Sequence, residues 1–106
     1  MSMRLSEALP DVAQEVAALL EKQGHGELAQ QVPDLPLRDR CRCGDYFCAT
    51  FYAVQPPRGA WGPGHENIAL EPEEGMMILD VVNNRIVAVE LLHREDVRRR
   101  LLELLP

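Results

Sequence analysis

Residues 76–92 read MMILDVVNNRIVAVELL, and the prediction of the fold starts from this stretch because it carries the clearest β-hairpin signal in the chain. Two runs rich in valine, isoleucine and leucine flank Asn83 and Asn84, and asparagine adopts positive φ more readily than most residues. A two-residue turn at these asparagines predicts that Val81 pairs with Ile86. Both faces of the hairpin are mostly apolar, so we expect strands covered on both sides, or covered on one side by a partner.

Upstream of this hairpin the pattern predicts three more strands. Residues 38–53, RDRCRCGDYFCATFYA, read as a second hairpin with strands at about 37–43 and 47–54, because apolar and polar residues alternate there. The segment QPPRGAWGPG at 55–64 is rich in proline and glycine and is therefore expected to be an irregular loop. A short strand at about 66–70 follows it.

Helices are predicted at both ends of the chain. Apolar residues recur every three or four positions between about Pro10 and Gly24, which is typical of an amphipathic helix, and 26–32 could add two further turns. A last amphipathic helix is predicted at 95–105. The sequence thus predicts one α+β domain over 1–106, with an N-terminal helix or helix pair, a roughly five-stranded, mainly antiparallel β-meander, and a C-terminal helix packed on the sheet.

Composition narrows the classes of partner. A formal net charge of −6 argues against nucleic acid or an anionic membrane as the main partner. The one basic run, Arg98 to Arg100, is expected to be a solvated face near the C-terminal end of the last helix, where the helix dipole favours cations. No apolar run approaches the roughly 18 residues that span a bilayer, and the chain has no signal-peptide pattern. The odd number of cysteines fits a reducing compartment, so a cytoplasmic location is expected.

The three cysteines lie within eight residues, and the register of their hairpin decides where they point. A two-residue turn at 44–45 pairs Cys41 with Cys48 and places Cys43 on the same face. All three thiols would then lie within reach of one ion. A histidine from elsewhere in the chain would complete a tetrahedral zinc site.

A loop one residue longer gives the opposite outcome. Cys43 then pairs with Phe47, and Cys41 pairs with Ala49, so that these two cysteines become small buried core residues. The arginines of the first strand share the other face with Cys48, which becomes the one thiol free to react. Binary patterning favours this second register, because it separates apolar from polar residues more cleanly. The C-x-C spacing also lacks the usual C-x2-C to C-x4-C pair of a structural zinc site.

Histidines and acidic residues give weaker signals. His65 lies near Trp61 and Arg58 at the edge of the loop, where a small ligand or a peptide could dock, whereas His25 is expected to be a solvated turn residue. His93 is expected at a helix entry. Either His65 or His93 could be the fourth zinc ligand.

The sequence does not indicate an acid–base pair. The predicted turn pairs Asp80 with Val87 and places Asp80 and Glu90 on opposite faces, which makes them a poor acid–base pair. The chain also contains none of the common nucleotide-binding, zinc-protease or serine-hydrolase motifs, so no enzyme class is indicated and no cofactor is expected.

Two segments carry a resemblance. The hairpin at 75–92, with Ile78-Leu79-Asp80 before the turn and Arg85 to Leu92 after it, resembles the closing hairpin of a family of short, uncharacterised bacterial domains. The segment CRCGDYFCATFY resembles that of small uncharacterised actinobacterial or proteobacterial proteins. The resemblance supports a β-meander and implies no activity.

Two functional hypotheses follow. The favoured one is a non-enzymatic module that associates with itself or binds another protein through the apolar sheet face or the Trp61 loop. The alternative is a metal-binding or thiol-based regulator that uses Cys41, Cys43 and Cys48. An enzyme acting on a small molecule with the loop at 58–65 has the least support. No catalytic, cofactor-binding or metal-binding residue is assigned on the favoured hypothesis.

Overall fold

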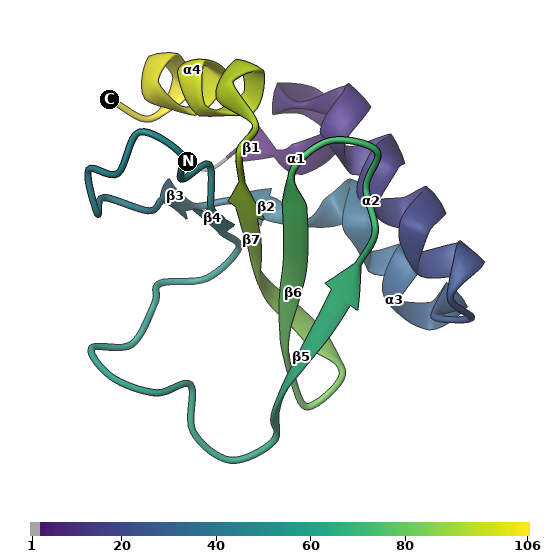
Figure 1. Cartoon of the computed structure of the whole chain (residues 1–106). Helices are drawn as coiled ribbons and strands as arrows, with labels where there is room; N and C mark the ends of the chain where they lie inside the picture. Colours follow the sequence, from purple (N-terminus) through teal and green to yellow (C-terminus); the bar gives the residue numbers. More distant parts are fainter. Residues whose placement is uncertain (1–2) are drawn as a thin grey trace.

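The protein is described here by a computed structural model covering residues 3–106, and the predicted α+β class is confirmed (Figure 1). Its main sheet is antiparallel and has the strand order β3-β4-β7-β6-β5, while β1 and β2 form a separate two-stranded sheet. The elements in chain order are β1 (Met3–Arg4), α1 (Leu5–Ala8), α2 (Pro10–Lys22), α3 (Gly26–Gln31), the 3-10 turn η1 (Val32–Asp34), β2 (Pro36–Leu37), β3 (Asp39–Arg40), β4 (Phe51–Tyr52), β5 (His65–Leu70), β6 (Met76–Val82), β7 (Arg85–Leu92) and α4 (Glu95–Leu104).

The hairpin of β6 and β7 closes as predicted but contains a β-bulge. Asn83 and Asn84 have φ of 50° and 65°, as a two-residue primed turn requires, and Val81 pairs with Ile86. The register then shifts by one residue, so that Asp80 pairs with Ala88. The predicted pairing of Asp80 with Val87 is therefore wrong. A bulge adds one residue to one strand, and beyond it every side chain of that strand lies on the face opposite to the one expected.

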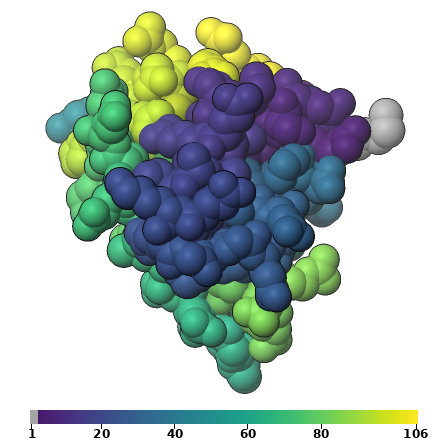
Figure 2. Space-filling view, turned by 90° about the vertical axis from the view of Figure 1, so that its right-hand side faces the viewer, coloured from purple at the N-terminus to yellow at the C-terminus, as the bar shows by residue number. Residues whose placement is uncertain are grey.

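One face of the sheet forms the hydrophobic core with the helices. Its buried side chains join those of α1 to α4 in one apolar cluster. On this face the strands contribute Phe51, Leu70, Met77, Leu79, Val89 and Leu91. In Figure 1 α2 and α3 lie on one side of the sheet, and the loop that joins β4 to β5 lies on the other. Figure 2 looks at the helical side, where the purple and blue residues of α1 to α3 occupy the middle of the face and green residues of the strands are visible beside and below them.

No helix of residues 3–106 covers the opposite face, here called the open face (Figure 1). The register of the four paired strands places on it Tyr52, Asn67, Ile78, Asp80, Ala88 and Glu90. The sequence predicted an apolar second face, but this list contains four polar side chains. The bulge explains the difference in part, because it moves Glu90 to the same face as Asp80.

The N-terminal helix pair begins and ends close to the predicted residues. Pro10 is in the first turn of α2, where its missing N–H costs nothing, and Gly24 ends the helix with a φ of 84°. The Gln31 side chain at the end of α3 then binds the turn of the long hairpin, donating to the Asn84 carbonyl (2.6 Å) and accepting from the Ile86 N–H (3.0 Å). The helix layer and the sheet are thus joined by polar as well as apolar contacts.

Helix α4 packs at the end of the sheet and is attached to α2 by ion pairs. Arg100 binds Asp11 through two hydrogen bonds of 2.9 and 2.7 Å. The pKa of Asp11 is lowered to about 2, mainly by the hydrogen bond from Arg100. The expected role of Arg98 to Arg100 at the helix C-terminus is wrong, because the last turn of α4 contains no basic residue. Among residues 3–106 no helix has the length and apolarity that crossing a membrane requires.

Candidate functional site

The cysteine hairpin adopts neither of the two registers that the sequence suggested. Asp39 pairs with Tyr52, and the Cys41 N–H donates to the Thr50 carbonyl at 2.9 Å. The connection from 42 to 49 is therefore much longer than a tight turn. Its second half pairs with the end of β7 instead, since the Ala49 N–H donates to the Leu91 carbonyl at 2.7 Å. The alternation within 38–53 could not show that β7 pairs with this segment, and that pairing determines the length of the loop.

The favoured interpretation of the arginines is also wrong. Arg40 pairs with Phe51 and so lies on the helix side of the sheet, where patterning disfavoured it. The charge is accommodated because Arg40 Nε donates to the carbonyl of Leu105, just after α4, at 2.6 Å. Carbonyl groups at a helix C-terminus lack intrahelical partners and attract cations. An edge strand thus tolerates an arginine that a central strand would exclude.

The three cysteine side chains converge. The Sγ atoms of Cys41, Cys43 and Cys48 all lie within 4.8 Å of one another, and no disulfide joins them. Cys43 is exposed, while Cys41 and Cys48 are half-buried. The prediction that Cys41 and Cys43 are core residues and that Cys48 is the one free thiol is therefore wrong. We call these three residues the thiol cluster.

Hydrogen-bond donors surround the thiol cluster. An N–H hydrogen bond from Asp45 lowers the pKa of Cys43, but desolvation and the two neighbouring thiols outweigh it and raise this pKa to about 11. Desolvation opposes ionisation of Cys48, yet hydrogen bonds from the hydroxyl and N–H of Thr50 lower the pKa of that thiol. The Leu91 N–H donates to Thr50 Oγ1 at 3.1 Å, which leaves the hydroxyl proton for the sulfur. Cys48 thus ionises more readily than an ordinary thiol because its pKa is lowered, whereas Cys43, whose pKa is raised, resists ionisation unless a cation is added.

A small cavity of about 30 Å³ lies beside the thiol cluster, and all three cysteines line it. Its volume is close to that of one water molecule or ion. Arg40 and Arg98 also line it, so two positive charges lie next to the sulfurs. This arrangement offsets the negative charge that thiolates would bring to a partly buried position.

The histidines proposed as the fourth ligand lie elsewhere. His65 Nε2 is 2.7 Å from Asp80 Oδ1, and its ring lies beside that of Trp61, with 6.3 Å between the ring centroids. His93 is exposed and stacks on Phe47. Neither histidine belongs to the group of donor atoms within 4.8 Å, which consists of the three sulfurs among the residues described. The expectation that His65 or His93 completes the cluster is therefore not supported.

A carboxyl pair lies on the open face near the thiol cluster. Asp80 is 4% exposed, and its Oδ1 lies 2.7 Å both from His65 Nε2 and from Asn67 Nδ2. A hydrogen bond with Asp80, burial and the charge of Asp80 raise the pKa of Glu90 to about 7, against a smaller opposing effect of His65. Glu90 therefore loses its proton only near neutral pH. The register places Glu90 on the same face as Asp80, so the prediction that the two lie on opposite faces is wrong.

Tyr52 lies between the carboxyl pair and the thiol cluster. Burial raises the pKa of its hydroxyl to about 12, with smaller contributions from a charge and hydrogen bond at Cys41 and from the charges of Cys48 and Glu90. The tyrosine is thus close to both groups. No sequence signal marked Thr50, Tyr52 or Asn67 as site residues, because only the order of the strands brings them to one face.

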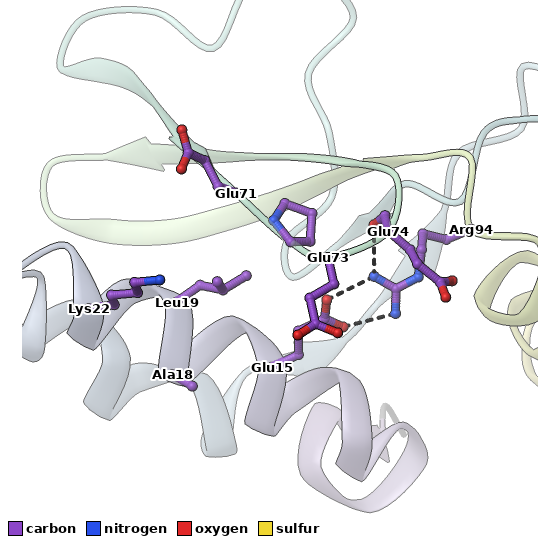
Figure 3. Close-up of a pocket in the computed structure, with 9 residues that line it drawn as sticks. Glu15, Ala18, Leu19, Lys22, Glu71, Glu73, Glu74 and Arg94 are labelled. Atoms are coloured by element: carbon purple, nitrogen blue, oxygen red, sulfur yellow. Dashed lines mark hydrogen bonds and ion pairs between the residues drawn. The ribbon is translucent and has the colours of Figure 1, made fainter.

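A different hollow, of about 480 Å³, lies between α2 and the turn that follows β5 (Figure 3). Arg94 reaches across it and binds both carboxylate oxygens of Glu15 at 2.8 and 2.9 Å. Figure 3 also shows the contact of Arg94 with Glu74, whose carbonyl accepts from Arg94 Nη1 at 3.4 Å. The described residues that line the hollow include no cysteine or histidine. The ion pair between Arg94 and Glu15 joins the start of α4 to α2, so we assign it a structural role.

Comparison with known proteins does not identify a relative: no family model matches the chain, and no curated protein or solved structure matches it. The resemblance of the two hairpin segments to small bacterial proteins stays a prediction.

Proposed function

We propose that this protein binds one thiophilic metal ion of the zinc type through Cys41, Cys43 and Cys48. The observation that carries the proposal is the distance between the three sulfurs, which all lie within 4.8 Å of one another. Tetrahedral zinc with Zn–S bonds of about 2.3 Å holds its sulfurs about 3.8 Å apart. A contraction of about 1 Å is sufficient, and small rotations about χ1 can supply it.

The hydrogen bonds around the sulfurs support the same function. Metal ligands are thiolates, and N–H or O–H donors to sulfur stabilise that form and orient it. Cys43 accepts from the Asp45 N–H, and Cys48 accepts from the Thr50 N–H and hydroxyl. Three thiolates around Zn²⁺ carry a net charge of −1, which Arg40 and Arg98 beside them would offset.

The number of protein ligands favours a regulator over a purely structural site. Structural zinc sites are closed by four protein ligands, whereas three protein ligands leave one position for water or an added group. Asp45 lines the cavities on both sides of the cluster but is not one of the donors within 4.8 Å. A metal held by three thiolates exchanges more readily than one in a closed site, which suits a protein that responds to metal or to thiol oxidation.

The test is metal analysis of protein purified without chelator and then equilibrated with Zn²⁺. We expect about one zinc per chain, loss of thiol reactivity on loading, and a thiolate-to-metal charge-transfer band with Co²⁺. Each of C41S, C43S and C48S is expected to weaken binding by at least about ten-fold. His25→Gln is the matched control, because His25 is a metal-donor residue outside the cluster. A zinc content near zero, with three freely titrating thiols, would exclude the proposal.

A second candidate function is self-association, favoured by one specific observation. A groove of about 770 Å³ lies beside the turn of the long hairpin, and most of its lining is apolar, including Leu35, Pro36, Ile86 and the 39% exposed Val54. Contact between two copies would cover this surface. Light scattering coupled to size-exclusion chromatography is expected to show a dimer that V54E converts to a monomer. A monomeric wild-type protein at high concentration would exclude this function.

A further inference from the structure

The open face carries a cavity whose lining differs in character from the thiol cluster beside it. Its volume is about 350 Å³, which is within the range of sites for small molecules. Asp80 from β6 and Glu90 from β7 line it, together with Tyr52 from β4 and Thr50 just before β4. The remaining lining residues are Cys41, Asp45, Phe47, Cys48, Trp61 and Leu92.

The charged side chains that line this cavity are all acidic. Three carboxyl groups line it, from Asp45, Asp80 and Glu90, and none of the described lining residues is lysine, arginine or histidine. Asp80 is 4% exposed, so its charge is only weakly screened by solvent. The His65 and Asn67 side chains that bind Asp80 fix the orientation of the carboxylate. A cation in the cavity would therefore be attracted, and an anion would be repelled.

The walls of the cavity are aromatic. Phe47, Tyr52 and Trp61 all line it, and the Tyr52 and Trp61 rings lie side by side with centroids 6.5 Å apart. The faces of aromatic rings carry negative electrostatic potential and attract amines and guanidinium groups more than they attract a hydrated metal ion. Trp61 comes from the loop between β4 and β5 and is half-buried against the sheet. Rings and carboxyl groups thus meet in one concave site, the arrangement that binds organic cations.

We propose that this cavity binds a small organic cation of the amine or guanidinium class. Its N–H groups donate to the Asp80 and Glu90 carboxyl oxygens, and its planar or alkyl part packs against Trp61 and Tyr52. The cation is either a free small molecule or a lysine or arginine side chain of a peptide. Binding does not require a metal at the thiols, since Cys41 and Cys48 form only one wall of the cavity.

The test uses the fluorescence of Trp61, the only tryptophan of the chain. The wild-type protein is titrated with methylguanidinium chloride and, separately, with methylurea, a neutral molecule of nearly the same shape. We expect a saturable change of Trp61 emission with methylguanidinium and none with methylurea. A matching response to methylurea, or no saturation with methylguanidinium at millimolar concentration, would overturn the proposal.

Two variants locate the site. Glu90→Gln keeps the shape of the side chain but removes the negative charge that Glu90 carries at pH 8, so at that pH we expect it to weaken binding by about ten-fold or more. Glu71→Gln is the matched control, because Glu71 is exposed and lines the separate hollow beside α2. Its affinity is expected to equal that of the wild type. Equal affinity in Glu90→Gln, whose fold is checked by circular dichroism, would refute the assignment of the cavity.

Two further titrations identify the chemical source of the cation and exclude a metal ion. Acetyl-Gly-Arg-Gly-amide presents the same guanidinium group on a peptide, and tighter binding than methylguanidinium supports a peptide ligand. Tighter binding of methylguanidinium supports a free small molecule. CaCl₂ is the inorganic probe, and a saturable response to Ca²⁺ that competes with methylguanidinium and is stronger than it would overturn the proposal of an organic cation.

Discussion

Replacement of Glu90 by glutamine is expected to change how the stability of the protein depends on pH. The hydrogen bond with Asp80, together with burial and the charge of Asp80, raises the pKa of Glu90 to about 7 from an ordinary value of 4.5. The folded protein therefore binds this proton more tightly than the unfolded chain does. The stabilisation is fully present below pH 4.5 and is lost as pH rises through about 7. In Glu90→Gln the side-chain amide N–H group can donate a hydrogen bond to Asp80 at every pH, because an amide does not titrate.

The size of the effect follows from the displacement of the pKa. At about 1.4 kcal/mol per pH unit, a change from 4.5 to about 7 corresponds to at most about 3–4 kcal/mol. Glu90 is half-buried, so solvent screening reduces the expected value to about 1–2 kcal/mol. Glu90→Gln is expected to match the wild type near pH 5 and to exceed its free energy of unfolding by this amount at pH 8.

The assay is urea denaturation at pH 5, 6, 7 and 8, followed by Trp61 fluorescence and by circular dichroism. At each pH the free energy of unfolding of the wild type is subtracted from that of the variant, which removes the contribution of groups that titrate alike in both proteins. Glu71→Gln, at an exposed position, serves as the control and should give a constant difference. If the profiles of Glu90→Gln and wild type run parallel from pH 5 to 8, the pKa of Glu90 is not raised and the reasoning fails.

Further predictions concern the backbone and the hydrogen bonds at the thiols. Gly75→Ala is expected to cost more than about 2 kcal/mol of stability, because Gly75 has a φ of 76° and a methyl group there would clash with a backbone carbonyl of the neighbouring strand. Gly24→Ala, with a φ of 84° but open space around it, is expected to cost only about 1 kcal/mol, and thermal denaturation of both variants measures the contrast. Thr50→Val leaves the buried Leu91 N–H without its acceptor and should destabilise the fold by about 1–3 kcal/mol in urea. The same variant removes a donor to Cys48, so the pKa of that thiol should rise and its alkylation should move to higher pH; an unchanged alkylation profile would contradict the assigned hydrogen bond.

Local chemistry was sufficient to predict most elements of the fold. The spacing of apolar residues predicts α2, and Gly24 ends that helix because a left-handed residue is needed there. Asn83 and Asn84 predict the turn of the long hairpin for the same physical reason. These signals depend on residues a few positions apart, which the sequence shows directly.

The candidate site depends on contacts between distant residues, and so the sequence could not predict it. The alternation at 49–53 correctly predicts which side chains point into the core, but it does not reveal the length of the loop before them. That loop is long because the Ala49 N–H binds the Leu91 carbonyl of β7, and this pairing brings Cys48 toward Cys41. A pairing partner more than 40 residues away leaves no local pattern.

Periodicity and turn chemistry are local properties, and they were sufficient to predict an α+β chain with an antiparallel sheet, an N-terminal helix pair and a C-terminal helix. Which polar side chains come together depends on strand register and strand order, which are set by contacts between distant residues. One bulged residue in the long hairpin moves Glu90 to the face of Asp80. The hydrogen bond between Ala49 and Leu91 of β7 brings Cys48 toward the other two thiols. The side-chain period of a strand is two residues, so a register shift of one residue changes the face and creates or removes a site.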